Sequence, residues 1–297
     1  MTHAPDILCI GSVLWDVIGR SSSHMKVGSD VPGRITRLPG GVAMNIAMTL
    51  RRFDMTPAIL TAIGQDEEGA ELLSAADRMG IQTDHVYRSQ DLPTDRYMAV
   101  EGANGLIAAI ADAHSLEAAD DKILRPLQDG TLGSEKTPYA GPIALDGNLT
   151  EALLTEISQS PLFRAADLRV APASPGKAER LLPLLSHPTA TLYLNLEEAG
   201  LLCNKVFEAA KDGAEALRKR GAHRVLVTDG GKTAAACGPD GLISAAPPEV
   251  LVTRVTGAGD TFMAAHIAAE HSGAPGTDAL RSALQAAANY VSGDTHS

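Results

Sequence analysis

The chain has 297 residues, of which 44% are hydrophobic, 21% charged and 3% aromatic, and its formal net charge at pH 7 is −11. This length accommodates one large α/β domain or two smaller ones, and the composition is that of an ordinary globular protein. The acidic balance and the lack of a long Lys/Arg cluster argue against nucleic acid as a partner.

Cysteine usage and hydropathy indicate the compartment. Cys9, Cys203 and Cys237 lie far apart without a CxxC spacing, which argues against a disulfide framework or a zinc site. The sequence contains no apolar run of 18 residues, and its first residues lack the basic and apolar regions of a secretory signal. We therefore expect a soluble, cytoplasmic protein with no membrane partner.

Strand-like and helix-like patterns alternate along most of the chain. In chain order they predict a strand at 6–12, a helix at 40–53, a strand at 57–64, a helix at 67–80, strands at 141–147, 167–172, 191–195 and 223–231, and helices between them near 150–158, 177–185 and 206–220. This rhythm implies an α/β fold with a mainly parallel sheet that helices cover on both faces.

Two stretches interrupt this rhythm. Residues 32–38 and 95–113 read as strands joined by short loops, and the GANG segment within the second stretch has the turn chemistry of a hairpin. We expect strands from about 13–38 and 94–113 to form a small separate sheet on a single domain that spans 1–297. The turn-rich segment 127–141 is predicted to be a surface loop.

The segment VTGAGDTF, residues 255–262, places two glycines directly before a lone aspartate and a helical pattern. Gly257 and Gly259 allow a ligand to approach the backbone closely, and the free N–H groups of a helix start attract an anion. Asp260 could then accept the proton of a hydroxyl that attacks a phosphorus atom. The alternative is a tight loop in which Asp260 only caps the helix.

Five motifs in order resemble the ribokinase (PfkB) family of carbohydrate and nucleoside kinases, and the resemblance covers nearly the whole chain. The motifs are GGVAMNIA (from Gly40), IGQDEEG (from Ile63), NLEE (from Asn195), VTDGG (from Val227) and VTGAGDTF. The resemblance implies a ribokinase-like, doubly wound, mainly parallel sheet with a small β-sheet lid, and an ATP-dependent kinase that uses Mg²⁺.

The resemblance also assigns roles to individual residues. Asp260 would be the general base, and the backbone of Gly257, Ala258 and Gly259 would form the anion hole. Residues that would bind the substrate are Asp16, Gly40, Gly41, Asn45, Thr94, Tyr97 and Asp112. Residues that would bind ATP are Asn195, Thr228, Gly230, Gly231, Thr256, Gly257 and Gly259, while Glu198 would hold Mg²⁺ through water.

Simpler interpretations stay open for several of these residues. Asp16 could be a turn or capping aspartate, and Asn45 could be only a first-turn residue of its helix. Thr94 and Tyr97 could be ordinary strand residues. Other motifs fail: GGKT lacks the earlier glycine of a Walker A loop because position 226 is Leu, and His266 and His271 lie five apart, which implies no zinc site.

Within the family, the chain resembles the pseudouridine kinases in PGRI, NGLIAAIAD, LDGNLTEALL and VTGAGD. This implies transfer of phosphate from ATP to the 5′-hydroxyl of pseudouridine, and we expect a homodimer through the exposed faces of the lid sheet. Alternatives are a kinase for ribose, fructose or adenosine, and a non-catalytic nucleotide- or sugar-binding regulator. Arg254 and Val255 replace the Asp and Thr that many relatives use in a monovalent-cation loop, which leaves potassium dependence open.

Overall fold

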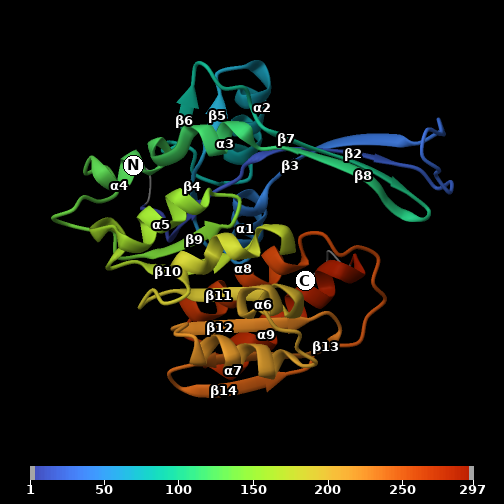
Figure 1. Cartoon of the computed structure of the whole chain (residues 1–297). Helices are drawn as coiled ribbons and strands as arrows, with labels where there is room; N and C mark the ends of the chain where they lie inside the picture. The colour runs from blue at the N-terminus through green and yellow to red at the C-terminus, as the bar shows by residue number, and fades with distance from the viewer. Residues whose placement is uncertain (1–3, 294–297) are drawn as a thin grey trace.

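A mainly parallel sheet runs through the centre of the molecule (Figure 1). The computed structural model describes residues 4–293, and within them this sheet has eight strands. In spatial order they are β14 (Gly241–Ala245), β13 (Lys232–Gly238), β12 (Arg224–Asp229), β11 (Thr191–Asn195), β10 (Asp167–Ala171), β9 (Pro142–Asp146), β1 (Ile7–Ile10) and β4 (Pro57–Leu60). The strands from β12 to β4 are parallel to their neighbours, whereas β13 and β14 extend the sheet antiparallel at one edge.

Helices cover both faces of the sheet. The first core cluster joins one face to α3 (His114–Ala119), α4 (Arg125–Gln128), α5 (Glu151–Gln159), α6 (Leu196–Cys203), α7 (Ala210–Lys219) and the 3₁₀ helices η1 (Asp120–Leu124), η2 (Pro161–Phe163) and η3 (Pro175–Leu184). The second cluster joins the other face to α1 (Val42–Arg51), α2 (Glu67–Arg78), α8 (Ala258–His271) and α9 (Gly276–Ser292). The predicted doubly wound architecture is confirmed.

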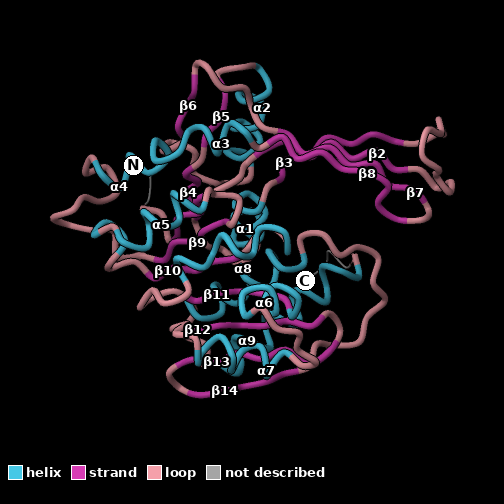
Figure 2. The backbone as a smooth tube through the Cα atoms, viewed as in Figure 1, coloured by secondary structure: helices cyan, strands magenta, loops and turns pink. Residues whose placement is uncertain are grey.

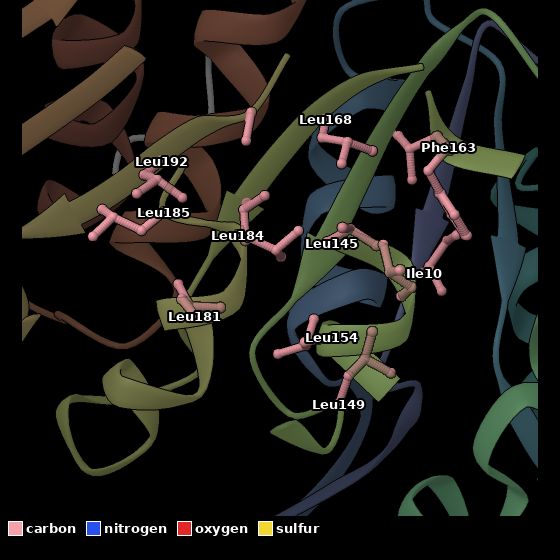
Figure 3. Packing of buried hydrophobic residues seen from close by; sticks show 14 of the residues in the cluster. Ile10, Leu145, Leu149, Leu154, Phe163, Leu168, Leu181, Leu184, Leu185 and Leu192 are labelled. Carbon is pink, nitrogen blue, oxygen red and sulfur yellow. The ribbon is translucent and has the colours of Figure 1, made fainter. Parts of the chain in front are cut away.

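Aliphatic side chains fill the core because aromatic residues are scarce. Figure 3 shows Ile10, Leu145 and Leu168 from three neighbouring strands facing helical residues such as Leu154, with all four fully buried. Each such side chain contributes roughly 1.5–3 kcal/mol when it leaves water. The strands read as continuous apolar runs because both of their faces are covered.

A second sheet projects from this body as a long arm (Figures 1 and 2). Its strands, in spatial order, are β3 (Arg34–Gly40), β2 (Leu14–Arg20), β7 (Arg96–Gly102) and β8 (Gly105–Asp112). Strand β2 pairs antiparallel with β3 and parallel with β7, and β7 and β8 form a hairpin. We refer to these four strands as the lid sheet.

Several elements differ from the sequence prediction. The expected strand 57–64 is split, because β4 pairs with β1 in the central sheet whereas β5 (Ala62–Gly64) pairs with β6 (Tyr87–Ser89) in a separate two-stranded sheet. The expected helix 177–185 is the 3₁₀ helix η3, which contains Pro183 and therefore lacks one backbone donor. The helices between 114 and 128, strands β13 and β14, and helix α9 were not predicted. Among the described residues, no helix has the length and apolarity needed to cross a membrane.

Candidate active site

Helix α8 begins at the glycine-rich segment that the sequence analysis singled out. Gly257 is its N-cap, with φ 87° in the left-handed region that favours glycine. The Ala258 amide donates to Val255 O at 3.0 Å, and the Thr261 amide donates to Gly257 O at 3.0 Å. In the described part of the chain, the amides of Gly257, Gly259 and Asp260 donate to no protein acceptor. The free donors at this positive helix end are therefore those of Gly257, Gly259 and Asp260, whereas the amide of Ala258 is engaged in the turn.

Asp260 lies half-buried in the first turn of α8. Burial raises the pKa of its carboxyl group to about 7, a hydrogen bond from Asn45 opposes that rise, and the charges of Asp146, Asp16 and Glu198 add to it. The Asn45 Nδ2 atom donates to Asp260 Oδ2 at 2.9 Å. A carboxylate with a pKa near neutrality, held in a fixed orientation, has the properties of a general base.

Asp16 lies on β2 at the base of the lid sheet, directly against Gly40 of β3. A Cβ atom at Gly40 would lie 2.1 Å from Asp16 Oδ2, so only glycine leaves room for this carboxylate. Burial raises the pKa of Asp16 to about 6. Tyr97 is paired with Asp16 in the register of β2 and β7, and the pKa of its phenol is raised by burial and by the Asp16 charge. The structure thus brings Asp16, Gly40 and Tyr97 together at the base of the lid sheet.

Gly41 is the N-cap of α1 and has φ 92°. A Cβ atom there would lie 2.4 Å from Ser12 O, and Ser12 Oγ accepts a hydrogen bond from the Val42 amide at 2.9 Å. The turn that delivers Asn45 to Asp260 is therefore built against Ser12, which the sequence analysis did not identify.

Ser12 belongs to a buried polar network that the sequence analysis missed. Its amide and hydroxyl donate to Asp146 Oδ2 at 2.7 and 2.5 Å, and Asn148 Nδ2 donates to Ser12 Oγ at 3.0 Å. Lys177 Nζ completes the network by donating to Asn148 Oδ1 at 2.6 Å. Asp146 ends β9, so the rule that functional groups gather at the carboxyl ends of parallel strands could have identified it.

Two expected substrate residues make other contacts. Thr94 is buried, its hydroxyl donates to Asp66 Oδ1 at 2.6 Å, and its amide donates to Asp66 Oδ2 at 2.7 Å. Asp112 is exposed at the end of β8 and is hydrogen-bonded to His114 Nδ1 at 2.8 Å. Within residues 4–293, no hydrogen bond or ion pair joins either residue to Asp260 or Asn45.

The residues of NLEE form a capping box at the start of α6. Asn195 Oδ1 accepts from the Glu198 amide at 2.8 Å, and Glu198 Oε2 accepts from the Asn195 amide at 2.8 Å. Burial raises the pKa of Glu198 to about 7. The motif therefore has a local structural role, and the Glu198 charge also acts on Asp260.

The residues of VTDGG end β12 and form the hairpin turn to β13. Gly230 has φ 55°, and the turn is closed by an ion pair of 3.1 Å between Lys232 Nζ and Asp229 Oδ2. Thr228 Oγ1 donates to Leu194 O at 3.5 Å, and Cβ atoms at Gly230 and Gly231 would meet no neighbouring atom. The turn is thus an open glycine hairpin at the same edge of the sheet as Asn195, which pairs with Thr228.

Glu198 is the described carboxylate that bears on whether this site could hold Mg²⁺. The described part of the chain contains no group of three or more His, Cys, Asp or Glu residues arranged to bind a metal by themselves. Mg²⁺ that accompanies a nucleotide needs only one or two carboxylates besides phosphate and water. Glu198 fits this need, because its Oε1 atom receives no hydrogen bond from the described residues.

Known proteins resemble this chain over nearly its whole length. Residues 4–293 match the pfkB family carbohydrate kinase. The pseudouridine kinase of Escherichia coli (strain K12) is 28% identical over 282 residues, covering 93% of this chain and 87% of that protein.

Two solved structures share the fold. A carbohydrate kinase from Agrobacterium tumefaciens superposes with a TM-score of 0.79 at 28% identity, covering 95% of this chain and 89% of the other. The Arabidopsis thaliana ribokinase complexed with ribose and ATP has a TM-score of 0.74 at 21% identity, covering 97% and 93%. The fold is ribokinase-like, and the chain belongs to the pfkB family of carbohydrate kinases.

Proposed function

We propose that this sugar or nucleoside kinase phosphorylates the 5′-hydroxyl of a ribose-type nucleoside, pseudouridine, with ATP as donor. The proposal depends above all on Asp260, whose carboxyl group has a pKa near 7 and lies at the N-terminal end of α8 beside Asn45. The choice of pseudouridine is supported by the similarity to the E. coli pseudouridine kinase. The choice of ATP is supported by the related fold of the ribokinase that was solved with ribose and ATP.

In the proposed reaction, the ribose hydroxyls donate hydrogen bonds to the Asp16 carboxylate, which can accept from two hydroxyls at once. The 5′-hydroxyl donates its proton to Asp260 as its oxygen attacks the γ-phosphorus in line. The bond from that phosphorus to the β–γ bridging oxygen breaks, and its electron pair leaves with ADP. Asn45 keeps the Asp260 carboxylate oriented toward the hydroxyl during this step.

The free amides at the start of α8 would stabilise the charge on the transferred group. The Gly257, Gly259 and Asp260 backbone offers N–H donors at the positive end of the helix dipole. Asn195, Thr228, Gly230, Gly231 and Thr256 would line the nucleotide at the edge of the sheet. A Mg²⁺ ion on the nucleotide would neutralise phosphate charge, with Glu198 Oε1 accepting from one of its waters.

We further propose that the lid sheet covers the substrate and joins two copies of the chain. Tyr97 and Thr94 would contribute to the substrate side of the lid sheet, which excludes water that would otherwise accept the phosphoryl group. Asp112 pairs with Arg96 and therefore lies on the opposite face, so it is not retained as a substrate residue. By strand register, Ile35, Met98 and Ile110 lie on the face opposite Asp16, with exposed fractions of 79%, 46% and 60%. An apolar face of this kind on a sheet with open edges favours pairing with a second copy.

The experiment is a phosphorylation screen with ATP and Mg²⁺ over pseudouridine, uridine, adenosine, ribose and fructose, with wild type and Asp260→Asn. We expect the highest kcat/KM with pseudouridine and a fall in kcat of at least ~10²-fold in the variant, with ATP binding retained. Near-normal turnover by Asp260→Asn would refute the role of Asp260.

A second candidate is a kinase for ribose or another nucleoside. It is supported by the Asp16 carboxylate, which lies against Gly40 and could accept hydrogen bonds from the hydroxyls of any ribose. In the screen, preference for ribose or adenosine would establish this candidate, and no turnover with any acceptor would favour a non-catalytic regulator.

A further inference from the structure

The loop that leads into Gly257 is mostly exposed. Leu251 and Val255 have exposed fractions of 82% and 70%, and no helix or strand is formed between β14 and α8 (Figure 1). A loop with so few buried groups needs specific contacts to hold one conformation. Those contacts come from the C-terminal end of α9.

The last carbonyl groups of α9 accept hydrogen bonds from this loop. Val291 O accepts from the amides of Thr253 at 2.8 Å and Arg254 at 3.2 Å. Tyr290 O accepts from Arg254 Nε at 2.8 Å, and the Arg254 guanidinium lies 3.9 Å from the centre of the Tyr290 ring. Carbonyls at a helix C-terminus lack intrahelical partners and carry the negative end of the dipole, so a guanidinium is stabilised there.

Tyr290 also reaches the anion hole directly. Its hydroxyl donates to Thr256 O at 2.8 Å, which fixes the peptide before Gly257. A Cβ atom at Gly257 would lie 2.6 Å from Tyr290 Oη, so the hydroxyl also limits the space on that side of the glycine. Helix α9 itself is anchored, because Leu280, Ala283 and Leu284 are buried in the core cluster that includes α8.

We propose that Arg254 and Tyr290 are positioning residues that hold Gly257 in its left-handed conformation and thereby keep the Gly259 and Asp260 amides aimed at the transferred phosphoryl group. We call this pair the α9 clamp. Neither residue is proposed to touch substrate, and the inference rests on the proposed kinase function. Because a guanidinium is always charged, the clamp provides a permanent positive charge at the loop where the sequence departs from the monovalent-cation pattern.

The test uses Arg254→Ala and Tyr290→Phe, with Arg254→Lys as the conservative variant and Arg281→Ala as the matched control. Arg281 lies on α9, like Tyr290, and its side chain is 68% exposed. Among residues 4–293 its one ion pair is with Asp278. For the clamp variants we expect kcat to fall roughly 10- to 100-fold, the scale of a 1 Å misplacement, with the KM for the acceptor nearly unchanged.

Arg254→Lys should retain part of the lost activity because it keeps the charge. Millimolar guanidinium chloride should partly restore Arg254→Ala, whereas sodium chloride at the same ionic strength should not.

A second measurement is independent of turnover. Hydrogen–deuterium exchange of the free protein should be faster in the peptide covering 255–261 for Arg254→Ala and Tyr290→Phe, and unchanged for Arg281→Ala. Faster exchange in the two clamp variants, together with a wild type that phosphorylates none of the acceptors, would keep the clamp and refute the function. Unchanged exchange, or unchanged kcat in an active kinase, would refute the clamp and leave the function standing.

Discussion

At the scale of single residues, the candidate site is a group of carboxylates that burial keeps partly protonated at neutral pH. The pKa values of Asp16, Asp260 and Glu198 are raised to about 6, 7 and 7, and burial is the first cause for each. Because the charges of Asp16 and Glu198 also raise the pKa of Asp260, the three groups titrate together. The protonation state of the site therefore changes between about pH 6 and 7.

This coupling predicts the pH dependence of turnover. A general base works only when deprotonated, so kcat should be low at pH 5 and rise through an apparent pKa of about 7. Asn45→Leu removes the hydrogen bond that lowers the pKa of Asp260, so its rise in kcat should move to higher pH. Initial rates from pH 5 to 9 check this prediction, and a wild-type profile that is flat between pH 5 and 8 would contradict it.

Gly40 shows how a residue without a side chain can be required by its neighbour. Gly40→Ala would place a methyl group on the Asp16 carboxylate, and a steric conflict of this kind is worth about 1–3 kcal/mol. We expect the KM for the acceptor to rise roughly 5- to 150-fold. Gly176→Ala is the control because a Cβ atom there meets no neighbour, and equal KM values in the two variants would show that Gly40 does not shape the pocket.

At the scale of elements, buried polar contacts fix α8 against the sheet. Glu270, in the last turn of α8, pairs with Arg169 of β10 and with Arg224 of β12. These cations and two hydrogen bonds outweigh the effect of burial and lower the pKa of Glu270 to about 2. One helical turn earlier, His266 is buried, its pKa is lowered to about 3 by burial, and its Nδ1 atom is 2.9 Å from the Tyr193 hydroxyl. The histidine is a neutral core residue.

Removing the Glu270 charge should weaken this attachment. Glu270→Gln leaves two partly buried arginines with one fewer anion, so we expect the free energy of unfolding at pH 7 to fall by about 3 kcal/mol. The pKa of Glu270 is lower in the folded chain than in the unfolded chain, so the ionised side chain stabilises the fold at pH values above the unfolded pKa of 4.5. That stabilisation is lost as the pH falls toward 2. Urea unfolding at several pH values should show the difference from wild type shrinking in acid. The exposed Glu156→Gln serves as the control, and an equal effect of the two substitutions would contradict the role of the ion pairs.

At the scale of the whole molecule, the lid sheet stands apart from the central sheet. It extends away from the body (Figure 2), and large apolar side chains on it remain exposed. A second copy that packed against the face of Ile35, Met98 and Ile110 would bury this apolar surface.

The proposed dimer leads to a prediction at this scale. Ile110→Asp places a charge on the apolar face, so a dimeric wild type should become monomeric in sedimentation velocity at micromolar concentration. Val206→Asp, at a side chain 91% exposed outside the lid sheet, should leave the oligomeric state unchanged. A wild type that sediments as a monomer would refute the dimer.

The sequence by itself determined the α/β class, the parallel sheet, the separate small sheet and the family, because periodicity and glycine spacing are local properties of a chain. It also singled out Asp260 at the start of a helix. It could not assign Ser12, whose role depends on a contact with Asp146, 134 positions away.

Only the tertiary structure decided how this aspartate behaves. Asn45 is 215 positions away from Asp260 in the chain, yet it donates directly to the Asp260 carboxylate. Burial moves the pKa of Asp260 toward 7. The tertiary structure also decided that the Ala258 amide donates within a turn and that the Arg254 guanidinium packs over the Tyr290 ring. The physical reason is that desolvation and hydrogen bonding depend on which distant groups packing brings within a few ångströms, and local sequence patterns carry no such distances.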